Sequence, residues 1–444
     1  MSSAERSSPI FPKTSPTKLA SLTGAVIGLC IVGDSLMYTI LPLEAENLGF
    51  DLWMVGLLLS ANRLIRLGSN SIASAVFERW GETNPFIFSA ILGLLSTALY
   101  GINAGFIVFL LARILWGIAW SGLRQGGYQA LWSAPDLSKG RLTGLLWGLI
   151  RAGSAFAAFV GGFFYDRFGY GATIALMVGV TGLALPLVLS IRWPVEANGA
   201  ATKSQKGRAS SGPERAAKVH PSESLSSSTA VQGWYQNFVG KYLREWRATL
   251  VKPSDKRLVA AGFCTLLHSS IVIATTALFI QKHLISGSDG GESTIAGGIG
   301  VGTAAGTVLA VRWISGLFIG PALGFVSDKI GQPMTALLLS FIQLVAIAAA
   351  VVLPASGALI GLLIVMIANG GLFVVLNAAV SVVAPKTAYP HRFVGIFTTA
   401  NDFGSAIGPL LALPLAGVLG IPLIYMSIGL LLQLVVGAYW LASR

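Results

Sequence analysis

Ionisable residues interrupt segments of this chain that are otherwise apolar. Removing a charged group from water is costly, so a charged side chain inside an apolar segment is by default a candidate for function. Asp34, in the stretch CIVGDSLMYT, is the first of these residues along the chain. The full set consists of Asp34, Arg63, Arg66, Arg113, Arg151, His268, Arg312 and Asp402.

Three of these side chains could bind and release a proton. Asp34 is the first candidate, because apolar surroundings favour the neutral form of a carboxyl group whereas a nearby cation favours its charged form. Asp402 is the second carboxyl candidate, and His268 could relay or sense the proton. A packing hydrogen bond from Ser35 or Tyr38 is the alternative explanation of Asp34, and helix packing is the alternative for His268.

Arginine outnumbers aspartate in this set. A guanidinium group suits bidentate contact with carboxylate or phosphate, so the excess favours an anionic or zwitterionic ligand. The alternative is that several of these arginines bond helix carbonyls or extend toward the membrane surface. The predicted substrate contacts are Arg63, Arg66, Arg113, Arg151, Arg312, Asn369 and Asn377. For the two asparagines, hydrogen bonds between packed helices are the alternative.

The segments that carry these residues are long enough to cross a bilayer. Hydrophobic residues make up 54% of the 444 residues, and charged residues make up 11%. Soluble domains carry about 25% charged residues, so the composition excludes a soluble protein. Each apolar run approaches the roughly 20 residues that cross a membrane. We predict twelve transmembrane helices, at about 20–43, 53–77, 85–103, 106–132, 141–165, 170–192, 257–281, 300–326, 333–353, 357–384, 392–418 and 421–441.

The chain divides into two helical regions with a tail and a linker. We predict a cytoplasmic tail at 1–19, a six-helix bundle at 20–193, a cytoplasmic basic linker at 194–256 and a second six-helix bundle at 257–444. The linker ends in GWYQNFVGKYLREWRATL, which predicts a helix lying on the inner membrane surface. We assign the basic charge there to this surface and not to nucleic acid. Lys and Arg in the connections on the same side predict cytoplasmic termini.

The two bundles carry matching strings. SAVFERWG follows the second predicted helix, and GFVSDKIG follows the eighth at an offset of 250 residues. APDLSKGRLTG and APKTAYPHRFVG, after the fourth and tenth helices, are offset by 251 residues. Because the offsets agree, they indicate an internal duplication. Pairing Cys30 with Cys264 then aligns Asp34 with His268.

These strings resemble the signature loop of the major facilitator superfamily, G-x-x-x-D-R/K-x-G. The second copy matches it at Gly324, Asp328, Lys329 and Gly331. The first copy keeps Arg79 and Gly81 but has Ser74 and Glu78. GGFFYDRFG repeats the string between the fifth and sixth helices, and LLARILWGIAW resembles the family's arginine motif. The family's antiporter motif is incomplete in the fifth helix, where Ala157 and Ala158 replace Gly-Pro.

The resemblance implies an all-α membrane protein of two pseudo-symmetric six-helix bundles, which expose a central site to one side of the membrane at a time. It implies that charges at the helix ends latch the cytoplasmic side, with solvated turn charges as the alternative. The residues of this gating motif are Glu78, Arg79, Gly81, Gly324, Asp328, Lys329 and Gly331. It also implies contacts between helices 2 and 11 and between helices 5 and 8, which would place Asp402 beside Arg63 or Arg66 and Arg151 beside Arg312.

We therefore expect a secondary active transporter in the cell membrane that moves a small organic anion or zwitterion with proton coupling. Efflux of an amphipathic drug or metabolite by proton antiport is the alternative, and a metal-ion cargo or a transport-inactive assembly or sensor protein ranks lower. The sequence lacks Walker, H-E-x-x-H and C-x-x-C strings, so we expect no cofactor, metal site or enzymatic activity. The expected partners are the substrate, protons and the lipid bilayer, and the expected state is a monomer.

Overall fold

The computed structural model describes residues 15–132, 136–193, 250, 252–282, 294–295, 299–387 and 390–444. The tail at 1–14 and the linker at 194–249, with most of its predicted surface helix, lie outside the described residues. The described helices are α1 (Pro16–Cys30), α2 (Val32–Glu44), α3 (Leu52–Trp80), α4 (Thr83–Leu99), α5 (Phe106–Trp132), α6 (Asp136–Gly182), α7 (Ala184–Leu189), α10 (Pro253–Ile280), α11 (Val301–Ile330), α12 (Gln332–Val352), α13 (Ala355–Val383), the short 3₁₀ helix η2 (Ala384–Lys386), α14 (Pro390–Val418) and α15 (Ile421–Ala442). The strands β1 (Thr294–Ile295) and β2 (Ile299–Gly300) pair antiparallel before α11.

These helices supply the twelve predicted membrane crossings. α1 and α2 together form the first crossing, because helical hydrogen bonds continue into and out of Ile31, the residue between them. α6 contains the fifth crossing and the start of the sixth, and Gly169, with φ 75° and ψ −178°, separates its two parts. α7 completes the sixth crossing. The remaining α-helices each supply one crossing.

Length and hydropathy support a membrane location. Among the described residues, seven helical stretches are long and apolar enough to cross a bilayer, and one of them, Arg141–Leu189, contains two predicted crossings. Large apolar side chains such as Phe88, Ile107 and Phe318 are more than half exposed on the outer surface. Water disfavours so much exposed apolar surface, whereas hydrocarbon covers it. The predicted fold class is confirmed.

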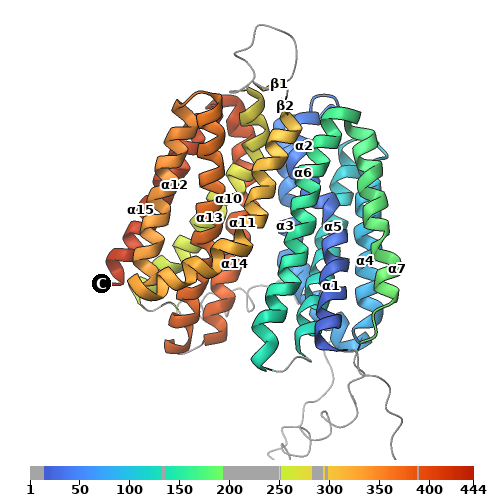
Figure 1. Cartoon of the computed structure of the whole chain (residues 1–444), viewed down its shortest axis with the longest axis horizontal. Coiled ribbons are helices and arrows are strands. Elements are labelled where there is room, and N and C mark those ends of the chain that lie inside the picture. The colour runs from blue at the N-terminus through green and yellow to red at the C-terminus, as the bar shows by residue number, and fades with distance from the viewer. Residues whose placement is uncertain are drawn as a thin grey trace, which may run out of the picture.

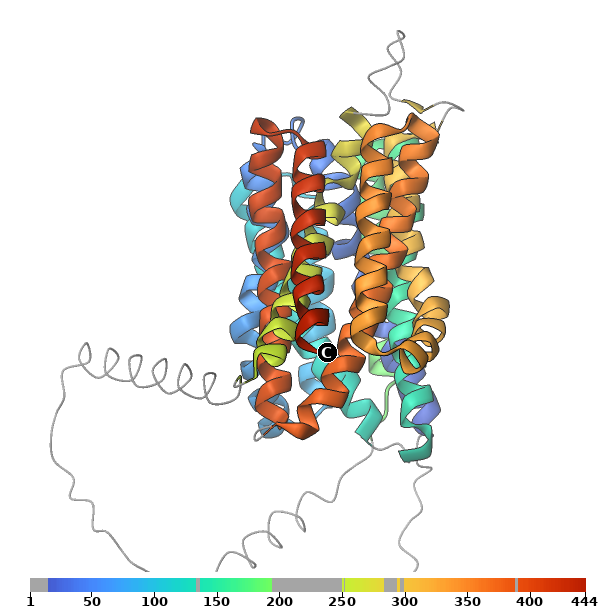
Figure 2. The same ribbon diagram turned by 90° about the vertical axis from the view of Figure 1, so that its left-hand side faces the viewer.

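Helices α1–α7 form one bundle and α10–α15 form the other, as Figure 1 shows, and in the turned view of Figure 2 the second bundle lies in front of the first. The bundles meet where α2, α3 and α6 pack against α10, α11 and α14. In particular, α3 packs against α14 and α6 packs against α11. The predicted contacts between helices 2 and 11 and between helices 5 and 8 are therefore confirmed.

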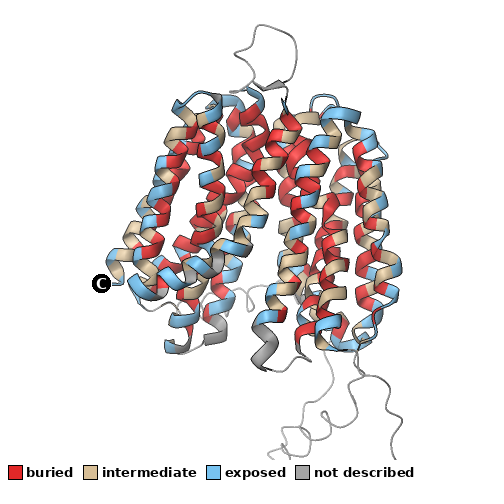
Figure 3. Cartoon of the chain, viewed as in Figure 1, coloured by how far each residue is buried: buried red, intermediate tan, exposed pale blue. Residues whose placement is uncertain are grey.

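The buried cores join the two bundles at one end only (Figure 3). We call the end where α1 begins and α15 ends the termini side, and the opposite end the distal side. One core cluster takes side chains from both bundles at the distal side, including Tyr38, Leu58, Leu278 and Tyr425. Toward the termini side each bundle has its own core. The bundles are thus packed together distally and diverge toward the termini side (Figure 1).

Glycines at matching positions of the two bundles explain part of the repeated strings. Gly81 ends α3 with φ 73°, and Gly331 ends α11 with φ 87°. Gly169 and Gly420 have φ 75° and 77° between the fifth and sixth and between the eleventh and twelfth crossings. A side chain is strained at such φ values, so glycine is favoured where the chain reverses between helices. The pairs are offset by 250 and 251 residues, which reproduces the offsets of the strings.

Candidate functional site

Asp34 and Arg113 form an ion pair inside the first bundle. Arg113 Nη1 lies 2.5 Å from Asp34 Oδ1, which also accepts a hydrogen bond of 2.9 Å from Asn62 Nδ2. The Arg113 side chain is fully buried, and that of Asp34 is 12% exposed. The ion pair therefore ties α2 to α5, and the hydrogen bond from Asn62 ties α2 to α3. Among the described residues, the hydrogen-bond partners of Asp34 are Arg113 and Asn62 and not Ser35 or Tyr38.

Each nitrogen of the Arg113 guanidinium group donates at least one hydrogen bond. Its Nε donates to the carbonyl of Leu58 at 2.8 Å, and its Nη2 donates to the Tyr38 hydroxyl at 3.3 Å. The Tyr100 hydroxyl lies 3.5 Å from Nη1. Burial and these bonds fix Arg113 as the counter-ion of Asp34. Arg113 is buried and paired with Asp34 in this structure, and its predicted role as a substrate contact stays a prediction.

His268, Asn369 and Arg312 form a second polar cluster in the other bundle. Asn369 connects them, because its Nδ2 lies 3.3 Å from His268 Nδ1 and its Oδ1 accepts a hydrogen bond of 3.1 Å from Arg312 Nη1. Asn369 also donates to Gln343 Oε1 at 3.3 Å. His268 is fully buried. Within the described part of the chain, His268 Nε2 and Arg312 Nε have no hydrogen-bond partner, so both keep unused hydrogen-bonding capacity.

Four arginines lie half-buried between or beside the bundles: Arg63, Arg66, Arg151 and Arg312. No ion pair joins any of them to a carboxylate of the described residues. Arg63 reaches the other bundle, where its Nη1 donates to the carbonyl of Ser405 at 2.6 Å and also to the Ser405 hydroxyl. Arg66 Nε donates to the carbonyl of Asn62 at 2.9 Å. Positive charge without a direct ion-pair partner is therefore concentrated in this region.

The predicted ion pair between Asp402 and Arg63 or Arg66 is not formed. Asp402 is half-buried in α14. Ser405, three residues further along α14, takes the place of a carboxylate by offering Arg63 both its carbonyl and its hydroxyl. The contact between α3 and α14 was inferred correctly. The residue of α14 that contacts Arg63, however, is Ser405.

Arg151 and Arg312 lie where α6 packs against α11, as predicted. Arg151 Nη1 is 3.1 Å from the position that a Cβ of Gly316 would occupy, so the arginine lies against α11 one turn beyond Arg312. Arg312 is also subject to electrostatic repulsion from Arg63 and Arg151. The three cations therefore destabilise one another unless an anion lies among them.

The gating motif lies apart from this site. Glu78, Arg79 and Lys329 are exposed at the termini side. Lys329 Nζ lies 4.3 Å from the centroid of the Phe325 ring. Gly324 and Asp328 belong to α11, but the side chain of Asp328 is not among the described parts of the chain. The role of the gating motif as a latch stays a prediction.

One predicted contact stays outside both polar clusters. Asn377 Nδ2 donates to the carbonyl of Phe373 in its own helix at 2.7 Å. It therefore satisfies a bond along α13 instead of joining Asn369.

A sequence model of the Major Facilitator Superfamily matches residues 23–409. The chain belongs to this superfamily. The match includes the residues of both polar clusters and all four half-buried arginines. Membership, together with the fold, makes the protein a multi-pass secondary transporter. A comparison of this chain with curated protein sequences finds no match.

Solved structures of similar fold are also transporters. A bacterial homologue of the human lysosomal transporter Spinster, in an inward-facing and unoccupied conformation, aligns with a TM-score of 0.69 and 15% identity over 98% of each chain. The nucleoside transporter NupG aligns with a TM-score of 0.69 and 12% identity over 97% of this chain and 100% of its own. A POT family transporter in complex with 5-aminolevulinic acid aligns with a TM-score of 0.69 and 12% identity over 96% of each chain. At these identities the likeness shows the fold.

Three residues of the polar site were not identified from the sequence. They are Asn62, which bonds Asp34, Tyr100, which contacts Arg113, and Ser405, which bonds Arg63. Asn62 stands beside Arg63 within an apolar segment, so its burial in the membrane was a signal available from the sequence. Tyr100 and Ser405 gave no such signal, because tyrosine near a helix end and serine within a helix are common. Only the packing of α5 on α4 and of α3 on α14 brings them to the arginines.

Proposed function

We propose that this superfamily member transports a small organic anion or zwitterion and couples its movement to protons. The observation that carries the proposal is the charge balance of the central site. Asp34 is already paired with Arg113, whereas Arg63, Arg66, Arg151 and Arg312 form no direct ion pair with a carboxylate of the described residues. A bound anion would offset this repulsion and accept hydrogen bonds from the guanidinium groups.

The arrangement also suits alternating access. Arg63 and Arg151 belong to the first bundle and Arg312 belongs to the second, so an anion among them would contact both bundles. A site formed by both halves changes its geometry when the halves rock, which is the requirement for releasing cargo on the other side. The fold accommodates a cargo of this class, since one structural neighbour is solved with 5-aminolevulinic acid, a zwitterion.

Asp34 is the proposed proton site. Protonation would remove its charge and leave the fully buried Arg113 without an ionic partner, which favours a rearrangement of α2 and α5. Coupling requires that the two conformations differ in proton affinity, because a proton that binds both equally drives nothing. The 12% exposure of the Asp34 side chain gives protons a route to it in this conformation.

Both termini are proposed to face the cytoplasm of the cell, on the basis of the Lys and Arg distribution. The structure then corresponds to an inward-facing state. Efflux of an amphipathic drug or metabolite by proton antiport is the alternative, in which proton and cargo move in opposite directions.

A ligand screen followed by flux measurements tests the proposal. A ligand that binds the folded state raises its apparent stability. We expect organic anions or zwitterions to raise the melting temperature of the purified protein, and Arg312→Gln to weaken this effect. In liposomes an imposed pH gradient should then drive the best ligand uphill, and the direction of the effective gradient separates symport from antiport. Stabilisation by organic cations alone would contradict the proposed cargo class.

A further inference from the structure

The geometry points to Asp166 as a gating residue that holds the distal side closed by capping the first turn of α11. Asp166 lies in GGFFYDRFG, the copy of the signature string between the fifth and sixth crossings. The inference rests on the proposed alternating-access function, because a gate has meaning only if the distal side opens during transport.

The carboxylate of Asp166 makes three hydrogen bonds to the other bundle. Its Oδ1 accepts from the backbone N–H of Gly302 at 2.9 Å. Its Oδ2 accepts from the backbone N–H of Thr303 at 2.7 Å and from the Thr303 hydroxyl at 2.6 Å. Because α11 begins at Val301, these N–H groups belong to its first turn and have no partner within the helix. A negative charge is stabilised there by the helix dipole as well.

The backbones of α6 and α11 approach each other closely at this point. A Cβ on Gly302 would lie 2.8 Å from Asp166 Oδ1 and 2.8 Å from the carbonyl oxygen of Gly162. Both distances are shorter than real Cβ contacts allow. The absence of a side chain at 302 is therefore a condition for the contact, which indicates that the sequence is adapted to a tight distal closure.

Position distinguishes this contact from an ordinary helix cap. Asp166 belongs to the first bundle and its partners belong to the second, so any separation of α6 from α11 must break all three hydrogen bonds together. The neighbouring carboxylate Glu44, by contrast, accepts a hydrogen bond of 2.6 Å from Tyr165 within the first bundle. That bond can persist when the bundles part.

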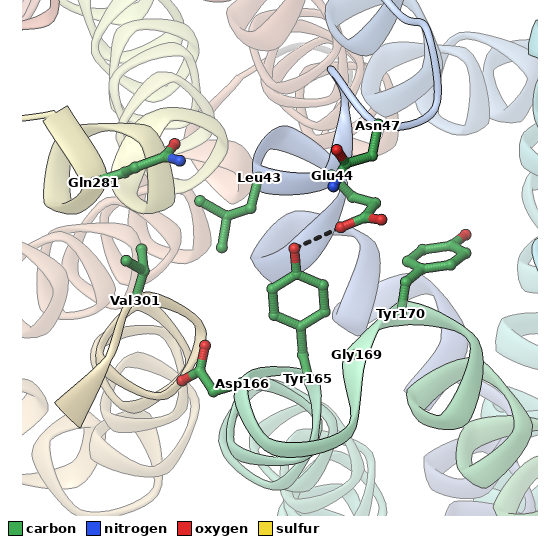
Figure 4. Close-up of a pocket in the computed structure, with 9 residues that line it drawn as sticks. All are labelled: Leu43, Glu44, Asn47, Tyr165, Asp166, Gly169, Tyr170, Gln281 and Val301. Atoms are coloured by element: carbon green, nitrogen blue, oxygen red, sulfur yellow. Dashed lines mark hydrogen bonds between the residues drawn. The ribbon is translucent and has the colours of Figure 1, made fainter. Parts of the chain in front are cut away.

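The contact borders a pocket of about 390 Å³ at the distal side (Figure 4). Residues of both bundles line it, with Glu44, Asp166 and Tyr170 on one side and Gln281 and Val301 on the other. The pocket gives water access to the carboxylate. Water can therefore replace the three hydrogen bonds when they break, so the contact is strong enough to bias the closed state without locking it.

The copy of the signature string at the distal side contacts the other bundle, whereas the copy that contains Glu78 and Arg79 lies where the bundles diverge. Distally, Asp166 is bonded across the bundle interface. At the termini side, Glu78 and Arg79 are exposed and the bundles diverge. This opposition is what a rocking mechanism requires, since closing one side separates the other.

Distances between spin labels test the gate directly in the purified full-length protein without cargo. One label pair, Ile102→Cys with Ser356→Cys, reports on the distal side, and both positions are exposed. A second pair, Thr83→Cys with Met334→Cys, reports on the termini side at exposed positions. The native Cys30 and Cys264 are buried, so labelling falls on the introduced cysteines.

We expect Asp166→Asn to raise the population with the longer distal distance several-fold and to shorten the distance at the termini side. Gly302→Ala should shift both distances in the same directions by steric means, and Thr303→Val should shift them less, because it removes only the hydroxyl bond. Arg167→Gln is the matched control, since Arg167 is an exposed neighbour in the same string. It should leave both distances unchanged.

A lower melting temperature of Asp166→Asn with unchanged distances would overturn the proposal, because Asp166 would then only stabilise α11. Unchanged distances in both Asp166→Asn and Gly302→Ala would overturn it as well. The readout needs no cargo and no flux. A shift in distances without anion transport would therefore support the gate and contradict the proposed cargo. Anion transport with unchanged distances would support the cargo and contradict the gate.

Discussion

The ion pair between Asp34 and Arg113 leads to the most direct prediction about this transporter. Asp34→Asn removes the negative charge and changes the side-chain volume little. We expect the variant to be less stable and to lose proton-driven accumulation of cargo, while it keeps downhill movement. Both effects have the same cause, since Arg113 stays charged in a place where it has no surface exposed to water.

The expected size of the stability loss follows from the partners that remain. Removing one partner of a buried ion pair costs about 3–5 kcal/mol, chiefly because the other charge is left uncompensated. In Asp34→Asn, Arg113 would keep the Leu58 carbonyl and the Tyr38 hydroxyl as acceptors. The asparagine oxygen could also still accept from Arg113. We therefore expect a loss near the lower end, about 3 kcal/mol in the free energy of unfolding.

A double-mutant cycle with Arg113→Gln measures whether the two residues act together. Unfolding of the wild type, both single variants and the double variant in detergent micelles gives the four free energies. Residues in contact typically show coupling of about 0.5–3 kcal/mol, and we expect a value of at least about 1 kcal/mol here. Additivity within about 0.3–0.5 kcal/mol would refute the reasoning, because it is the behaviour of independent sites.

The transport arm of the test uses a cargo found by the ligand screen. Asp34→Asn in liposomes should exchange or equilibrate this cargo but should not concentrate it when a pH gradient is imposed. Asn62→Ala is the matched control, because it removes a neutral hydrogen bond to Asp34 and leaves the carboxyl group in place. Uphill transport by Asp34→Asn would show that the carboxylate serves packing, and Asp402 would become the candidate proton site.

The other predictions concern the cargo site, a chain reversal and the latch. Arg312→Gln should weaken anion binding at least roughly tenfold, because hydrogen bonds to charged groups contribute about 1.5–3 kcal/mol, and ligand-dependent melting curves measure this loss. Gly331→Ala should destabilise the protein by about 1–2 kcal/mol, as expected for a side chain in the left-handed region, while Gly179→Ala, which has open space around it, serves as control in the same unfolding assay. Glu78→Gln should lower the maximal flux rate and leave cargo affinity nearly unchanged, and a loss of affinity with an unchanged rate would contradict a role in the latch.

Much of the fold followed from local properties of the chain. Apolar runs of membrane length predicted helices, because a segment that crosses the hydrocarbon must satisfy its backbone N–H and C=O groups internally. The repeated strings then predicted two related bundles. The offset of the strings also matched the positions of the reversing glycines. The continuation of α6 past Gly169 and the division of the first crossing at Ile31 were not predictable, since backbone angles there depend on packing against other helices.

The residues of the candidate site could be recognised from the sequence, but their partners could not. Asp34, His268 and the arginines were visible in the sequence, because a charge within an apolar segment stands out regardless of its partners. Their pairing was not visible. Arg113 was predicted as a substrate contact, and the structure pairs it with Asp34. Asp402 was predicted to pair with Arg63 or Arg66, whereas Arg63 bonds Ser405 and Arg66 bonds the carbonyl of Asn62.

The sequence by itself determined that this protein crosses a membrane as two related helical halves and carries more positive than negative charge within it. Only the tertiary structure decided which of these charges are neutralised, and that Asp166 bonds across the bundles. The physical reason is that hydropathy and periodicity depend on neighbours along the chain. The ion pair within the first bundle and the helix cap between the bundles depend instead on how each helix is rotated about its axis. That rotation is determined by contacts between residues far apart in the sequence.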